Sequence, residues 1–170
     1  TEADHASHRL ICEALQRLTP NIPILSEEST LEQLIGRRDW PRCWMIDPLD
    51  GTREFIDGTG EFTVNIALIV DAESVLGLIA APSRGYVDLG VPGWGARRFS
   101  LFDDSVHGTL ATRSLNPGKP LVMSASSRHR EERVQLMLDK LSDLAGAAER
   151  LNAGSALKFC DVASGVADVY

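Results

Sequence analysis

Two carboxylates lie three residues apart in residues 47–52, which read Asp-Pro-Leu-Asp-Gly-Thr. The four residues before them, Cys-Trp-Met-Ile at 43–46, are apolar and predict a buried strand that ends at Asp47. A second short run at 24–28, Ile-Leu-Ser-Glu-Glu, also ends in acids. Two strands that deliver carboxylates at their ends could hold a hard divalent cation such as Mg²⁺, which prefers oxygen ligands. Each acidic pair alone also fits an ordinary turn, but the whole string together with the double Glu favours a metal site.

The carboxylates Glu27, Asp47 and Asp50 are the proposed metal ligands. The backbone carbonyl of Leu49 is a fourth candidate, because it lies between the two Asp residues within the same turn. Glu28, the second acid of its pair, could support the metal ligands without binding the ion directly.

The elements around these motifs can be predicted from periodicity. An amphipathic helix is expected over residues 4–18, with Thr1 as its N-cap and an apolar face formed by Leu10, Ile11, Ala14, Leu15 and Leu18. Strands are expected at 22–25, 62–70 and 75–81, the last two as a hairpin, and then at 86–91, 97–102, 121–124 and 166–170. Helices are expected at 129–144, with Val134, Met137, Leu138 and Leu141 on the apolar face, and at 155–163. Strands that first pair and then alternate with helices predict a layered α/β architecture.

Composition limits the class of protein. With 170 residues, 44% of them hydrophobic and 24% charged, the chain can bury the core of a globular domain. Its net charge of −7 argues against binding to a nucleic acid polymer, although not against a small phosphorylated substrate. The three widely spaced cysteines indicate reduced thiols in a cytoplasmic protein, and no apolar run reaches the length of a membrane span. Three histidines show no ligand spacing with an acidic motif and are expected on the surface: His5, His8 and His107.

The acidic motifs resemble those of a known superfamily. Residues 47–55, Asp-Pro-Leu-Asp-Gly-Thr-Arg-Glu-Phe, look like the signature of the inositol monophosphatase-like, metal-dependent and lithium-sensitive phosphatases, and residues 26–29 resemble their upstream acidic motif. Residues 52–55, 60–69 and 154–160 look most like the bacterial 3'(2'),5'-bisphosphate nucleotidases. The resemblance runs along the whole chain and is patchy between residues 86 and 118.

This resemblance implies an α/β (α+β) fold, a layered α-β-α-β-α sandwich of the sugar-phosphatase type. Residues 1–120 would supply its metal-binding half, and residues 121–170 the start of its substrate-binding half. Relatives carry a further N-terminal helix and, beyond the position of Tyr170, a Trp-Asp motif with a third metal-site Asp. We therefore expect the chain to lack N- and C-terminal segments of the fold, and expect it to be inactive and poorly soluble without them.

Catalytic roles are also implied by the resemblance. Thr52 would position the attacking water together with Asp4, and two or three Mg²⁺ ions would be bound. From the sequence alone, the favoured interpretation of Asp4 is a first-turn acid that stabilises a helix N-terminus, and only the resemblance makes it a catalytic candidate. Gly51 allows a close backbone approach to a phosphate, and the amides of Gly51 and Thr52 could begin a helix whose N-terminus attracts anions.

The substrate-binding signals are weaker. Ser126 lies where a strand meets a helix, in a segment that departs from the Ser-Arg-Ser-His of relatives, and a polar helix cap explains it equally well. Ser155 and Lys158 match a family segment whose members face the nucleotide, although a lysine at a helix start is usually solvated.

The resulting hypothesis is a Mg²⁺-dependent phosphomonoester hydrolase that converts adenosine 3',5'-bisphosphate, a by-product of sulfate assimilation, to AMP and phosphate. Its partner would be the small nucleotide, with no nucleic acid polymer and no transmembrane segment. Two alternatives stay open: an inositol- or sugar-phosphate phosphatase, and a non-catalytic metal- or phosphate-binding protein of the same fold. Retention of Thr52 and Asp4 beside the acidic motif argues against the non-catalytic alternative.

Overall fold

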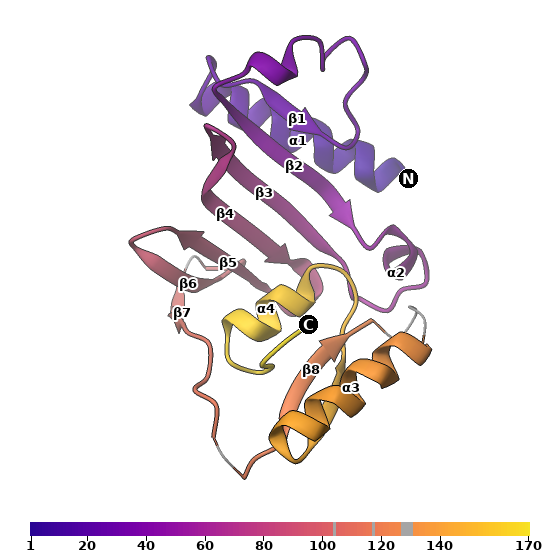
Figure 1. Ribbon diagram of the computed structural model, residues 1–170. Helices are drawn as coiled ribbons and strands as arrows, with labels where there is room; N and C mark the ends of the chain where they lie inside the picture. Colours follow the sequence, from indigo (N-terminus) through magenta and orange to yellow (C-terminus); the bar gives the residue numbers. More distant parts are fainter. Residues whose placement is uncertain (104, 117, 127–130) are drawn as a thin grey trace.

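The computed structural model describes residues 1–103, 105–116, 118–126 and 131–170. Figure 1 shows helices at both ends of the molecule with a large twisted sheet between them. In chain order the elements are α1 (Glu2–Leu18), β1 (Ile24–Ser26), a 3₁₀ turn (Arg37–Asp39), β2 (Arg42–Asp50), α2 (Thr52–Ile56), β3 (Thr63–Val70), β4 (Glu73–Ala81), a second 3₁₀ turn (Pro82–Arg84), β5 (Tyr86–Val91), β6 (Gly95–Ser100), β7 (Val106–Leu110), β8 (Leu121–Ala125), α3 (Glu131–Ala145), β9 (Ala148–Asn152) and α4 (Leu157–Ala163).

The strands form two sheets. The first has seven strands in the order β1 to β7, in which β1 runs parallel to β2 and every later neighbour is antiparallel. The second sheet pairs β8 with β9 in parallel, and a single parallel bridge joins Met123 to Val169 on the other side of β8. Because β1 and β2 are parallel neighbours, their carboxyl ends lie at the same edge of the large sheet.

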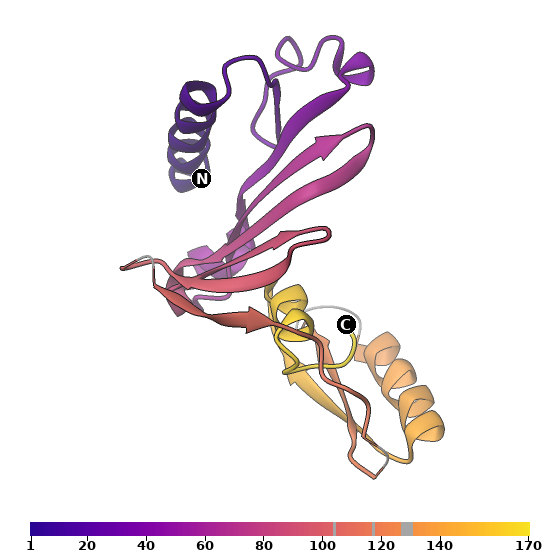
Figure 2. The same cartoon turned by 90° about the vertical axis from the view of Figure 1, so that its left-hand side faces the viewer.

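Helices cover the sheets from several sides. Figures 1 and 2 show α1 on one face of the large sheet and α4 on the opposite face, between the two sheets. α4 packs on β4 and β5 in a core that includes Ala81, Tyr86, Leu157 and Cys160, of which Leu157 is fully buried. α3 packs on β8 and β9 over a second core of Met123, Ala125 and Val134. The result is a series of alternating helix and sheet layers.

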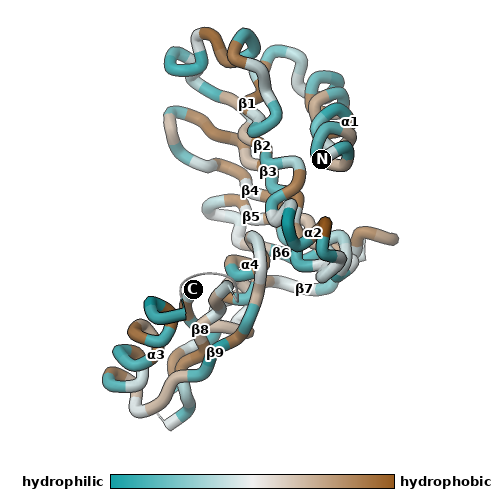
Figure 3. Tube along the Cα trace, turned by 90° about the vertical axis from the view of Figure 1, so that its right-hand side faces the viewer, coloured by the Kyte–Doolittle hydropathy of each residue, from teal (hydrophilic) through white to brown (hydrophobic). Residues whose placement is uncertain are grey.

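Two predicted apolar faces are only partly buried, which corrects the sequence expectation. Leu15 is buried, but Leu10 and Leu18 on α1 are 68% and 77% exposed. On α3, Val134 is buried whereas Met137 is 49% exposed. In Figure 3 both helices carry hydrophilic residues interleaved with hydrophobic ones along their length. Each helix rests on its sheet through a narrow part of its apolar face, so periodicity overestimated the buried area.

Several element boundaries also differ from expectation. The hairpin turn is shorter than the predicted 71–74, because Asp71 and Ala72 both adopt positive φ (50° and 66°) and close a two-residue turn of the kind favoured in hairpins. The strands β7 and β9 were not predicted, and residues 166–170 form one bridge where a strand was expected. Within the described part of the chain, no helix is long and apolar enough to cross a membrane.

Candidate metal and phosphate site

The carboxyl end of β2 presents the acidic motif. Its ladder with β3 is regular up to the pair Asp47 and Asn65, and then shifts register before Asp50 pairs with Thr63. This irregularity re-aims the last residues of the strand, because a bulge bends the bulged strand. The backbone N–H of Leu49 donates to Asp47 Oδ1 at 3.2 Å, which fixes that carboxylate within the turn.

The upstream acids reach the same edge through β1. Ser26 pairs with Ile46, and the Glu27 N–H donates to the Ile46 carbonyl at 3.3 Å, so Glu27 follows β1 directly beside the end of β2. Ser26 is buried, and its hydroxyl accepts from the Glu28 N–H at 3.3 Å. Parallel pairing of the short strand β1 with β2 is therefore what brings the Glu motif and the Asp motif together.

The carboxylates are close enough to repel one another. Burial, followed by the negative charges of Asp50 and Glu27 and then that of Asp4, raises the pKa of Asp47 to about 6. Burial and neighbouring like charges disfavour ionisation, so the ionised form of Asp47 costs stability at this edge of the sheet. A bound cation removes that cost, and this is the electrostatic signature expected of a metal site.

Helix α1 supplies Asp4 and helix α2 begins with Thr52, the two residues that form the catalytic pair predicted from the family resemblance. Asp4 is 5% exposed, and the Thr52 hydroxyl lies 3.3 Å from Asp4 Oδ1 and 3.4 Å from the Leu49 carbonyl. Ser7 adds a second contact between α1 and the end of β2, because its hydroxyl donates to the Pro48 carbonyl at 2.8 Å. The structure therefore brings Asp4 and Thr52 together from positions 48 residues apart.

The start of α4 meets the same turn from the opposite side. The Ser155 hydroxyl lies 2.6 Å from Asp50 Oδ2 and 2.7 Å from the Thr63 hydroxyl. Gly51 has φ 88°, and a Cβ there would lie 2.9 Å from the Glu61 carbonyl oxygen, so both conformation and space require glycine. α2 has only five residues, so the predicted anion-attracting helix N-terminus is reduced to a single short turn.

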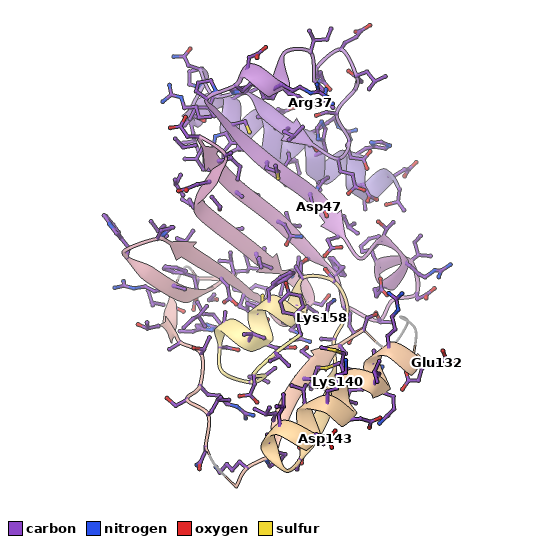
Figure 4. The ribbon with its side chains drawn as sticks, viewed as in Figure 1. Arg37, Asp47, Glu132, Lys140, Asp143 and Lys158 are labelled. Carbon is purple, nitrogen blue, oxygen red and sulfur yellow. The ribbon has the colours of Figure 1, made fainter. Side chains whose placement is uncertain are left out.

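The other two predicted substrate residues lie farther along the second half. Lys158 is half-buried at the start of α4, and its ammonium group donates to the Ser155 carbonyl. Figure 4 shows Lys158 on α4 and Asp47 on β2. Ser126 directly follows β8, and its backbone carbonyl accepts from Arg150 Nη2 at 3.2 Å. The motif around Ser126 extends over residues 127–129, which lie outside the described residues.

Of the histidines expected on the surface, His5 is exposed and His8 is half-buried, and both contact the segment that carries the upstream acidic motif. His5 Nδ1 lies 3.0 Å from Glu28 Oε2, and His8 Nδ1 lies 2.9 Å from the buried Ser26 hydroxyl. Both project from α1 toward the turn after β1, so Glu28 contacts α1. The helical spacing i, i+3 could have placed the two histidines on one face, but only the fold shows that this face meets β1.

The donor set fits Mg²⁺ in type. It consists of the carboxylates of Glu27, Asp47 and Asp50 and the Leu49 carbonyl, all of them oxygen ligands. Among the described residues, no group of three or more His, Cys, Asp and Glu side chains is already placed so that it could hold a metal ion. The Glu27 side chain is exposed, and those of Asp47 and Asp50 are half-buried.

The fold is that of a layered α/β protein in which two acidic motifs lie at one edge of the large sheet. The sequence profile of the inositol monophosphatase family matches residues 1–170, and the chain belongs to that family. It is 40% identical over 170 residues to the 3'(2'),5'-bisphosphate nucleotidase CysQ of Salmonella typhimurium and 38% identical to the protein of that name in Escherichia coli K12. Both alignments cover the whole chain, which spans 64% of the length of each relative.

Solved structures agree with the family assignment. CysQ from Bacteroides thetaiotaomicron superposes with a TM-score of 0.76 at 33% identity, over 94% of this chain and 63% of that chain. SuhB of Mycobacterium tuberculosis gives a TM-score of 0.74 at 29% identity, over 98% and 63% of the two chains. The sequence-based predictions of family and fold class are confirmed.

Proposed function

We propose that the protein containing this chain is a Mg²⁺-dependent phosphomonoester hydrolase that removes the 3'-phosphate of adenosine 3',5'-bisphosphate to give AMP and phosphate. The geometry that carries the proposal is the contact between the Thr52 hydroxyl and Asp4, at 3.3 Å, beside the carboxylates of Asp47 and Asp50. The nucleotide is chosen over other phosphate esters because relatives at about 40% identity carry that activity in their names.

Each residue has a proposed role in this reaction. Glu27, Asp47, Asp50 and the Leu49 carbonyl would hold two or three Mg²⁺ ions, which would neutralise the phosphate dianion. The Thr52 hydroxyl, while donating to Asp4 or to the Leu49 carbonyl, keeps lone pairs that can accept a hydrogen bond from the attacking water. Asp4 would hold the orientation of that hydroxyl and take up the proton.

The proposal also covers the residues that bind the substrate, the two halves of the fold and the cellular location. Gly51 would let the backbone approach the phosphate, with Ser126 and Lys158 contributing from the second half. Residues 1–120 would form the metal-binding half and residues 121–170 the start of the substrate half, a division supported by the separate sheets on either side of residue 121. A cytoplasmic location is part of the proposal and is supported by three free cysteine thiols.

Phosphate release tests the proposal directly. Full-length protein is given adenosine 3',5'-bisphosphate or inositol 1-phosphate in parallel, with Mg²⁺, with EDTA, and with Mg²⁺ plus Li⁺. We expect release mainly from the nucleotide, abolished by EDTA and inhibited by Li⁺. Release mainly from the inositol ester would keep the metal site and overturn the substrate, and no release from either would overturn the enzymatic proposal.

A further inference from the structure

The side chain of Asp50 is held by a chain of hydroxyl groups from two distant segments. Ser155 Oγ lies 2.6 Å from Asp50 Oδ2 and 3.0 Å from the Asp50 carbonyl oxygen. The Thr63 hydroxyl lies 2.7 Å from Ser155 Oγ, and Thr63 is fully buried. A hydroxyl has one proton to give, so when Ser155 donates to the carboxylate, Thr63 donates to Ser155. The order of donation is then Thr63 to Ser155 to Asp50.

The backbone around Ser155 is built to make this contact. Ser155 adopts φ 53°, an uncommon conformation for a residue with a Cβ, which costs free energy unless the surroundings fix it. The preceding Gly154 approaches Glu61 so closely that a Cβ would lie 3.0 Å from the Glu61 side chain. Gly51 has the same constraint on the other side, where a Cβ would lie 3.2 Å from the Cβ of Ser155. Three chain segments therefore meet in van der Waals contact at this hydroxyl.

Helix α4 is also fixed at its far end. Asp161 is buried and accepts from the Ser124 hydroxyl at 2.8 Å, and Arg84 lies 3.6 Å from its other carboxylate oxygen. Thus α4 is tied to β8 of the second sheet and to the turn after β4 of the first. The position of Ser155 at the start of α4 follows from packing of both sheets.

We propose that Ser155 and Thr63 are positioning residues that hold the Asp50 carboxylate in the orientation required for metal binding. The inference deepens the proposed function and rests on its metal site. Ser155 donates to Asp50 Oδ2 and Thr63 holds the Ser155 hydroxyl, which would leave Oδ1 for the cation, as outer partners of metal-binding carboxylates commonly do. The role differs from the expected one, in which Ser155 faces the nucleotide, because its hydroxyl is already engaged by Asp50 and Thr63.

Metal affinity of the full-length protein, measured without any substrate, tests the inference. Binding of Mn²⁺, as a stand-in for Mg²⁺, is followed by loss of the free-ion EPR signal in Ser155→Ala, Thr63→Val and Thr63→Ser. Ser164→Ala is the matched control, because it removes a hydroxyl bond of 2.7 Å to the Cys160 carbonyl on the same helix, away from Asp50. Thermal unfolding in EDTA is measured for all four variants.

Loss of the hydroxyl at either position should weaken Mn²⁺ binding by about tenfold or more. Thr63→Ser loses a buried methyl group but keeps the hydroxyl, so it should unfold at a lower temperature and still bind Mn²⁺ like the wild type. Ser164→Ala should also bind normally. Wild-type affinity in both Ser155→Ala and Thr63→Val would overturn the inference, as would weakened binding that follows the loss of stability across all four variants. If the protein hydrolyses no phosphate ester yet shows the expected pattern, the proposed function fails and the positioning role stands.

Discussion

Replacement of Asp47 by Asn separates two effects of this carboxylate: the stability that its buried charge costs, and its proposed contribution to Mg²⁺ binding. In the absence of metal, Asp47 is destabilised in its ionised form by burial and by the charges of Asp50 and Glu27. Asn has the same shape, carries no charge, and keeps an oxygen to accept from the Leu49 N–H. We therefore expect Asp47→Asn to be more stable than the wild type in EDTA at pH 8, and less stable than the wild type in saturating Mg²⁺.

The magnitude follows from the shift in pKa. The rise from the ordinary value of 3.8 to about 6 corresponds to about 3 kcal/mol of unfolding free energy. Because the carboxyl group is only half-buried, solvent screening reduces this to about 1–2 kcal/mol. The pKa of Asp47 is higher in the folded state than in the unfolded state. The free energy of unfolding of the wild type therefore falls as pH rises from 3.8 to about 6, and this contribution stays constant at higher pH. The advantage of the variant should thus be full at pH 8 and shrink toward zero near pH 4.

Urea unfolding followed by circular dichroism at pH 4 and pH 8, in EDTA and in Mg²⁺, measures both effects. The matched control is Glu32→Gln, which removes one negative charge from an exposed loop. The free energy of unfolding of the wild type should rise with Mg²⁺ concentration, because a ligand that binds only the folded state stabilises it. The variant should gain much less stability from Mg²⁺. A variant that is no more stable than the wild type at pH 8 in EDTA would refute the electrostatic argument. A variant that gains as much from Mg²⁺ as the wild type would refute the assignment of Asp47 as a ligand.

Three further substitutions test other parts of the site and fold. Gly51→Ala should lower the free energy of unfolding by at least about 2 kcal/mol in urea titrations. Gly58→Ala is the control, because Gly58 also has positive φ but open space around it, and it should cost about 1 kcal/mol. Equal costs would contradict the close approach of Gly51 to the Glu61 backbone. If the protein has the proposed activity, Thr52→Val should reduce kcat by at least about 100-fold with little change in melting temperature. Thr52→Ser should keep most of the activity, because in the proposed mechanism the hydroxyl and not the methyl group orients the water. Arg98→Met should lower the free energy of unfolding by about 3 kcal/mol, because it removes the two 2.7 Å hydrogen bonds to the buried Asp88 carboxylate. Adding Asp88→Leu should recover part of that loss, and additive losses would show that the pair is not coupled.

Local patterns in the sequence predicted the elements with strong signals. The two runs of apolar and β-branched residues in the hairpin of β3 and β4 and the apolar run before Asp47 are properties of neighbouring residues, and these strands formed where expected. β9 was missed because its sequence, Ala-Glu-Arg-Leu-Asn, has no β-branched residue and becomes a strand only by pairing with β8. Tertiary pairing overrides propensity there, and no single-sequence argument contains that information.

The candidate site also contains residues that local sequence patterns predict and residues that only the fold brings together. The acids could be named in advance because they are concentrated in two short motifs, and the parallel pairing of β1 with β2 then brings the motifs to one edge. The groups that hold those acids in place come from far along the chain, as with Thr63 and Ser155, which are 92 residues apart. A lone serine or threonine gives no signal in a sequence, because its hydroxyl acquires a role only from what the fold places beside it. Family resemblance pointed to the segment containing Ser155 and assigned it to the substrate, whereas the contact of its hydroxyl with Asp50 Oδ2 supports the positioning role proposed above. If the edge binds a cation as proposed, its affinity should therefore depend on the uncharged partners of the carboxylates as much as on the carboxylates themselves.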